Sequence, residues 1–233
     1  MKALDNLVIK TKLFPPASRT GVITRSSLNQ AIDTIRKKKV AWVHAPAGYG
    51  KTTLLYQWYK SMLGNTLTVC WLSLDELDDD PVTFVRYVLC AFQEVVDDFW
   101  VDAANWMEGR LEPDITITLN HIINELIRID RPLTLFIDDY HHINSVEIHQ
   151  FIERLVDWSP ENFVLVIGSR IVPSISLSKW RVSEEMTEVD VSMLRFSSIE
   201  AKAFLERKHQ LKLTEEQIAV ITEKSEGWAA GLQ

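Results

Sequence analysis

The sequence predicts an α/β protein with a mostly parallel sheet that is covered by helices on both faces. Four continuous apolar runs bounded by turn residues are typical of buried parallel strands, and they lie at 40–43, 68–74, 133–137 and 163–168. Segments of helical period alternate with these runs and lie after residue 51 and at 81–99, 115–129 and 146–158. The strict alternation of strand and helix is the pattern of strands linked by helical crossovers.

The bulk composition is that of an ordinary globular protein, with 46% hydrophobic and 24% charged residues. A chain of 233 residues can bury one α/β core and carry a smaller appendage. It contains no apolar stretch of the roughly 20 residues that a membrane helix needs and no signal-peptide core, so we expect a cytoplasmic protein without a membrane partner. Cys70 and Cys90 both lie in apolar segments, which favours buried thiols over a disulfide or a metal site.

The formal net charge is −7, from 25 Lys and Arg against 32 Asp and Glu. Because neutralising phosphates needs a basic face, the chain itself is not expected to bind nucleic acid non-specifically. The single basic run, at 36–39, is interpreted as a solvated helix end whose charge complements the helix dipole.

A phosphate-binding motif stands between the first strand and the helix that follows it. The segment reads Ala45-Pro46-Ala47-Gly48-Tyr49-Gly50-Lys51-Thr52. It is the relaxed form of a P-loop, since alanine replaces the usual first glycine. In such a loop the backbone N–H groups and the helix N-terminus surround the phosphates, and the glycines let the backbone come close. The motif predicts binding of ATP or ADP together with Mg²⁺.

Individual side chains of this motif have distinct expected roles. Lys51 would place its charge on the β- and γ-phosphate oxygens, which makes it a catalytic as well as a binding residue. The Thr52 hydroxyl would ligate Mg²⁺, and Thr53 would lie near the α-phosphate. The alternative is a glycine turn that caps an ordinary βα unit, but a chance match to this motif with a strand before it and a helix after it is rare.

The apolar run at 133–137 ends in two acids, as the second motif of P-loop proteins does. Asp138 is suited to hold Mg²⁺ through water, and Asp139 to orient or deprotonate the attacking water. The strand at 68–74 lies between the two motifs in the chain. We interpret it as the strand that one subclass of P-loop proteins inserts between the strands carrying them.

The run at 163–168 is followed by Ser169-Arg170, which places an arginine at the carboxyl edge of the sheet, where open α/β folds bind ligands. Arg170 would either contact the γ-phosphate or form a surface salt bridge. His141 and His142 are interpreted as polar loop residues and not as a metal pair. The acids at 75–80 lack the spacing of a calcium loop and are expected to cap the helix that starts near Pro81.

From Ser197 onward the pattern is helical only. Ser197 and Glu200 form a capping-box signature before a helix at 199–208, and a second helix is expected near 213–224. We therefore predict a nucleotide-binding domain at 1–195 and a partial, lid-like helical domain at 196–233. Because the sequence ends inside an amphipathic segment, further domains are expected beyond Gln233.

Several segments also match a known family in order and spacing. They are 12–16 with Arg19, 22–25 with Leu28, 45–53, 71–75, 136–141, 169–170, 194–197 with Glu200 and Ala201, and 226–233. Together they resemble the amino-terminal module of the MalT-like, large LuxR-type ATP-dependent transcriptional activators, in the STAND class of signal-transduction NTPases.

The resemblance implies a switch in which ADP holds the protein at rest and ATP with an inducer allows self-association and activation of transcription. Slow hydrolysis would reset it. Sensor repeats and a DNA-binding domain would lie carboxyl-terminal to this segment, so DNA would be contacted only through that later domain. The resemblance also places Arg25 near the adenine and Arg170 in the sensor position.

Two other functions are open at this stage. A small-molecule kinase with a P-loop would need an acceptor pocket and usually an arginine-rich lid, and residues 100–130 contain no arginine cluster. A scaffold that does not hydrolyse nucleotide would not need Lys51, Thr52, Asp138 and Asp139, all of which are present.

Overall fold

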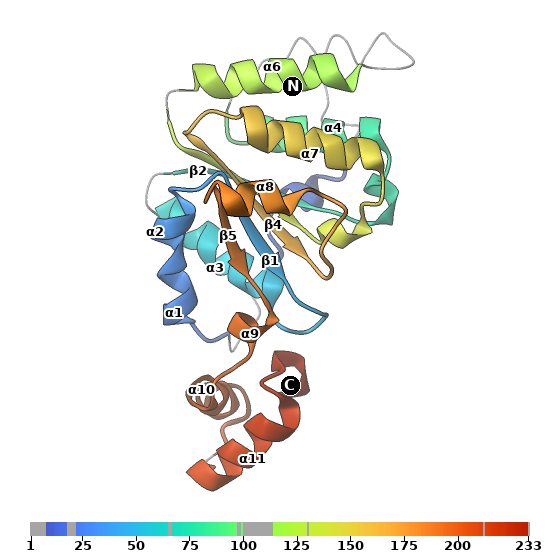
Figure 1. Cartoon of the computed structure of the whole chain (residues 1–233). Coiled ribbons are helices and arrows are strands. Elements are labelled where there is room, and N and C mark those ends of the chain that lie inside the picture. The colour runs from blue at the N-terminus through green and yellow to red at the C-terminus, as the bar shows by residue number, and fades with distance from the viewer. Residues whose placement is uncertain are drawn as a thin grey trace.

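A computed structural model describes residues 8–17, 22–64, 67–96, 99, 114–129, 131–211 and 213–232. Five parallel strands form one sheet in the order β2-β3-β4-β1-β5, with helices on both faces (Figure 1). The strands are β1 Val40–His44, β2 Thr68–Ser73, β3 Leu133–Asp138, β4 Phe163–Ser169 and β5 Met186–Val189. The four predicted strands are confirmed to within one residue at each end. Of the family markers, Arg19 and Gln233 lie outside the described residues.

The sheet order corrects one prediction. The strand that lies in space between β1 and β3 is β4, which pairs with both, whereas β2 is an edge strand that pairs with β3. The prediction that residues 68–74 are the inserted strand is therefore wrong. Order along the chain does not fix order in a parallel sheet, because each helical crossover can skip a neighbour.

Strand β5 was missed from the sequence. Only Val189 of its four residues is buried, and it forms the other edge of the sheet beside β1. Thr187 and Glu188 interrupt any apolar run here. An edge strand with one buried position carries too little hydrophobic pattern to be recognised.

The helices are α1 Ser26–Asn29, α2 Ala31–Ile35, α3 Lys51–Gly64, α4 Pro81–Gln93, α6 Ile115–Arg128, α7 Val146–Trp158, α8 Leu177–Val182, α9 Val191–Leu194, α10 Ser198–His209 and α11 Glu215–Ser225. The helix predicted at 81–99 ends earlier, at Gln93. Phe99 nevertheless packs on Phe92 with ring centroids 4.8 Å apart, so the apolar pattern continues past the end of the helix. As predicted, Asp80 caps α4. Asp75 instead caps a short 3-10 helix that was not predicted, η2 at Glu76–Asp78.

The two faces of the sheet carry separate hydrophobic clusters. Trp42 of β1 points into the cluster that includes α4, α6 and α7, while Ala41 and Val43 point into the cluster with α2 and α3. Figure 1 shows these two groups of helices on opposite faces of the sheet. Burial on both faces explains why the strands are continuously apolar. Cys70 and Cys90 are both buried and form no disulfide, and no described helix is long and apolar enough to cross a membrane.

The carboxyl-terminal part, α10, α11 and the 3-10 helix η4 at Ala229–Leu232, packs around a third, smaller cluster. Ser197 and Glu200 form the predicted capping box of α10, and Thr214 and Gln217 form another at α11. Ile23, from the segment before α1, joins this cluster. The domain boundary after residue 195 stays a prediction, because the amino-terminal segment contributes to both parts.

Candidate functional site

The loop between β1 and α3 has the backbone conformation that a P-loop sequence requires. Gly48 and Gly50 both have φ of +83°, in the left-handed region that favours glycine. A Cβ on Gly50 would meet nothing within 4 Å, so only the backbone conformation demands glycine there. At Gly48 space is also short, since a Cβ would overlap Trp228 Nε1 and lie 2.6 Å from Ala230 Cβ.

Lys51, the first residue of α3, is folded back onto this loop. Its Nζ donates to the carbonyl oxygens of Ala45 at 2.7 Å and Pro46 at 3.0 Å, and the residue is only 6% exposed. Burial lowers the pKa of the ammonium, and the charges of Asp139 and Asp138 partly oppose this effect. The lysine is therefore held at the loop, with the carboxylates of Asp138 and Asp139 close enough to interact electrostatically with its ammonium.

Asp138 is the last residue of β3 and is only 2% exposed. One of its carboxylate oxygens accepts the N–H of Asp139 at 3.0 Å, and the carboxylate is also hydrogen-bonded to the Thr52 side chain. Burial, followed by the charge of Asp139, raises the pKa of Asp138 to about 6 despite those hydrogen bonds. The residues predicted to hold Mg²⁺, Thr52 and Asp138, are thus in direct contact.

Gly168 of β4 leaves the space that this carboxylate occupies. A Cβ on Gly168 would lie 2.8 Å from Asp138 Oδ1 and 2.9 Å from Leu55 Cδ2. Its backbone needs no positive φ, so the requirement for glycine here is steric. Sequence reasoning missed this residue, because a glycine at the end of an apolar run gives no hint of its neighbour.

Asp139 and His141 form a second polar pair directly after β3. Asp139 adopts φ of 58°, which aspartate tolerates better than most residues, and its Oδ1 lies 3.7 Å from His141 Nδ1. His141 is not the polar loop residue that was predicted. Both of its ring nitrogens are buried without a hydrogen-bond partner in the described part of the chain, and burial lowers its pKa to about 4. A neutral imidazole therefore lies beside Asp139 at neutral pH.

A cavity of about 530 Å³ opens beside the loop. The predicted site residues that line it are Arg25, Ala47, Gly48, Tyr49, Gly50, Lys51, Thr52, Thr53, Asp139 and Arg170. The other three predicted residues support it: Ala45 and Pro46 hold Lys51 through their carbonyls, and Asp138 contacts Thr52. Residues that are far apart in the sequence are brought together at the carboxyl edge of the sheet.

Part of the cavity lining was not predicted. Besides Lys208 it includes Val22, Ile23, Tyr56, Phe196 and Phe204, which we call the aromatic wall. They come from the segment before α1, from α3, from the α9–α10 linker and from α10. No local pattern distinguishes such residues from core positions, so only the fold reveals that they share a cavity.

The carboxyl-terminal turn also contacts the P-loop. Trp228 Nε1 donates to the carbonyl of Ala47 at 2.9 Å, and the N–H of Ala230 donates to the carbonyl of Gly48 at 3.0 Å. Ala229 lines the cavity. The segment at 226–233 was recognised as a family marker without a role in the site, and the structure places part of it on the phosphate-binding loop.

Comparison with solved structures establishes the fold. No family model matches the sequence. The structure resembles a Signal Transduction ATPase with Numerous Domains (STAND) protein with a tetratricopeptide repeat sensor from Pyrococcus horikoshii, with TM-score 0.55, 15% identity, and coverage of 92% of this chain and 29% of that one. It also resembles Cdc6p from Pyrobaculum aerophilum, with TM-score 0.58, 13% identity, and coverage of 94% and 61%.

A third match is the ORC1 protein of Aeropyrum pernix, solved in complex with DNA, with TM-score 0.51, 13% identity, and coverage of 93% and 58%. This chain therefore has the fold of P-loop NTPases. It spans between about a third and three-fifths of the length of these structures.

We predict that Gly168→Ala destabilises the protein by about 1–3 kcal/mol, because the added methyl group crowds the Asp138 carboxylate and Leu55. Urea denaturation would measure the change. In an Asp138→Ala background the same substitution should cost less, since one of the two clashes is gone. An equal cost in both backgrounds would contradict crowding of the carboxylate.

We also predict that Asp138→Asn stabilises the ligand-free protein at pH 8 by about 1–2 kcal/mol. The pKa of Asp138 is raised from 3.8 to about 6, so the folded state binds this proton more tightly than the unfolded chain does. Ionisation therefore lowers stability as the pH rises through that interval, and asparagine removes this loss. Denaturation at pH 8 and pH 4 tests it: the advantage should shrink at pH 4, and a pH-independent difference would refute the explanation.

Proposed function

We propose that the chain is an ATP-binding switch module of a signalling protein. The observation that carries this proposal is the shared cavity, which brings together the P-loop, Asp139 and Arg170, with the Thr52–Asp138 pair directly beside it. Its volume of about 530 Å³ is within the range of small-molecule sites, roughly 300–1,000 Å³. Its lining combines charged and polar groups with aromatic rings, which suits a phosphate chain joined to a base.

The residues fit Mg²⁺ as well as nucleotide. Mg²⁺ prefers oxygen ligands, and the Thr52 hydroxyl and the Asp138 carboxylate are near enough to each other to form a hydrogen bond. When bound, the cation would neutralise negative charge on the phosphates.

Each predicted residue has a role in this proposal. The loop from Ala45 to Thr53 surrounds the phosphates, and Lys51 moves its ammonium from the loop carbonyls to the phosphate oxygens. Asp139 accepts a proton from the attacking water, and the neutral ring of His141 lies beside its carboxylate. Arg170 contacts the terminal phosphate from the end of β4. Arg25 lines the same cavity next to Phe196.

The wider function we propose is that of a MalT-like, LuxR-type transcriptional activator of the STAND class. The ordered sequence motifs support it, and the fold is shared with a solved STAND protein. The ATP state would then favour self-association and the ADP state rest, with slow hydrolysis between them. Contact with DNA would belong to a domain carboxyl-terminal to this segment.

Lys51→Ala should abolish specific nucleotide binding, weakening the affinity for ATP by roughly 100-fold or more, because a charge-assisted contact is lost and the two carboxylates stay unopposed. Isothermal titration calorimetry and thermal shift with ATP, ADP and Mg²⁺ would measure it. Lys37→Ala, at an exposed lysine of the basic run, is the matched control. Unchanged ATP affinity in Lys51→Ala would refute the assignment of the site.

Asp139→Asn should keep ATP affinity within a few-fold of the parent but slow hydrolysis by roughly 100-fold, because the amide cannot accept the proton of water. Asparagine also tolerates the positive φ at this position, so the fold should be retained. Single-turnover phosphate release would measure the rate. Turnover at the parent rate would rule Asp139 out as the base.

A further inference from the structure

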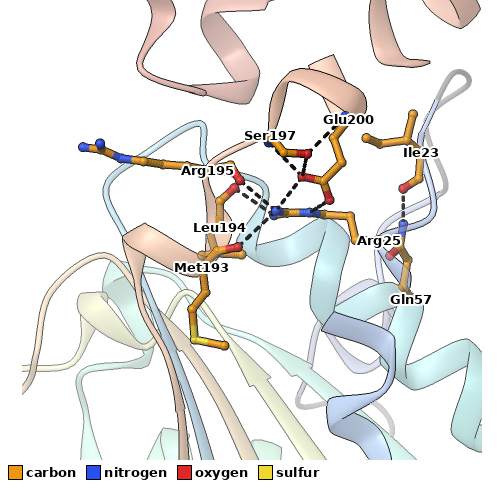
Figure 2. Close-up of polar contacts among 8 residues, drawn as sticks. All are labelled: Ile23, Arg25, Gln57, Met193, Leu194, Arg195, Ser197 and Glu200. Carbon is orange, nitrogen blue, oxygen red and sulfur yellow. Dashed lines mark hydrogen bonds and ion pairs between the residues drawn. The ribbon is translucent and has the colours of Figure 1, made fainter. Parts of the chain in front are cut away.

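The guanidinium of Arg25 points toward the end of α9 and the linker that follows it (Figure 2). Nη1 donates to the carbonyl of Leu194 at 2.8 Å, and Nη2 donates to the carbonyls of Met193 at 3.0 Å and Arg195 at 2.9 Å. These carbonyls lie at the end of α9, where a helix leaves its last acceptors unpaired. Arg25, which is 8% exposed, therefore satisfies the carboxyl end of that helix.

Glu200 holds the other side of the same guanidinium. Its Oε1 accepts from Arg25 Nε at 2.8 Å and its Oε2 from Nη2 at 3.3 Å. Oε2 also accepts the N–H and the hydroxyl of Ser197, which closes the capping box of α10. One ion pair thus joins the end of α9 to the start of α10, and we call Arg25, Glu200 and the carbonyls of residues 193–195 the linker clamp.

Residues beside the linker clamp form the aromatic wall of the cavity. The Arg25 guanidinium lies 5.3 Å from the ring centroid of Phe196, which lines the cavity. The N–H of Phe196 donates to the carbonyl of Gly227 at 2.9 Å, directly before the Trp228 that binds the P-loop. Two residues before Arg25, the carbonyl of Ile23 accepts from Gln57 of α3 at 2.7 Å (Figure 2).

We propose that Arg25 and Glu200 are positioning residues for the cavity, which act through the linker and not by touching the base of a nucleotide. The linker clamp fixes where Phe196 and α10 stand relative to the P-loop, so that the aromatic wall is in place before a ligand arrives. Preorganisation of this kind lowers the cost of ordering groups on binding. The ligand in this inference is the nucleotide of the proposed function, on which this part of the inference rests.

The geometry explains why the ion pair suits this task. A buried arginine that donates to five acceptors in a fixed fork leaves the linker few alternative positions. Arg25 is buried and Glu200 partly buried, and removing either partner leaves the other charge without its partner, so either single change should loosen the same segment. Two residues that act as one unit should therefore show strongly non-additive effects.

The test is a double-mutant cycle of Arg25→Gln, Glu200→Gln and the double variant, with Glu206→Gln, an exposed glutamate of α10, as control. Calorimetry with ATP and with GTP, each with Mg²⁺, reports affinity and base preference. Hydrogen exchange without nucleotide reports the amides at 196–200 and 227–232. Circular dichroism checks folding. If Arg25→Gln does not fold, the affinities and the hydrogen exchange of Glu200→Gln alone test the inference.

We expect each single variant to weaken the affinity for ATP and the affinity for GTP by a similar factor, about 10-fold, so that their ratio is unchanged. The double variant should bind no more weakly than either single variant. Amides in both segments should exchange faster in these variants and at the parent rate in Glu206→Gln. An altered ATP to GTP ratio in Arg25→Gln, with Glu200→Gln like the parent, would instead make Arg25 a base contact and overturn the inference.

The two proposals fail in different ways. If the parent binds neither nucleotide, the proposed function is wrong, and the exchange measurement still decides whether the clamp positions the cavity wall. If the parent binds ATP but the exchange of both segments is the same in every variant, the linker clamp is refuted and the nucleotide site stands.

Discussion

The buried carboxylate of Asp138 is the constraint around which the site is arranged. A carboxylate that is 2% exposed must be hydrogen-bonded, and its partners are the Thr52 side chain and the N–H of Asp139. The first partner fixes the start of α3 against the end of β3, and the second fixes the turn that carries Asp139. β4 lies between β1 and β3, and its Gly168 provides the room for the carboxylate. Loss of this room would disturb both motifs together.

Hydrophobic pattern predicted the sheet because its central strands are buried on both faces. It failed at β5, where a single buried valine leaves no pattern, and it placed β2 wrongly because pairing between strands is a long-range property. The phosphate loop and the acids after β3 were predictable, since their chemistry needs fixed residue types at fixed local spacing. Phe196, Phe204 and Trp228 were not, because aromatic residues with a role in a cavity look the same in sequence as aromatic residues in a core.

Arg25 illustrates the same limit at one residue. Sequence resemblance placed it near a base, and it does line the cavity. Within the described part of the chain, however, its guanidinium donates to the end of α9, to the linker after it and to Glu200. The two partners are 175 residues apart in the chain, and no local rule links them. A marker residue can therefore belong to a binding site by shaping it, without its charged group meeting the ligand.

The carboxyl-terminal turn also holds the P-loop by two hydrogen bonds. Trp228 donates to the carbonyl of Ala47, and Ala230 donates to the carbonyl of Gly48. Phosphates would be bound by the backbone N–H groups of the same loop, whose carbonyls these contacts occupy. A shift of the loop would therefore move Trp228. Through Gly227, which accepts from the N–H of Phe196, the movement would reach Phe196 and the linker clamp. The chain thus has a continuous set of contacts from the P-loop to the start of α10, and the proposed switch would need such a connection.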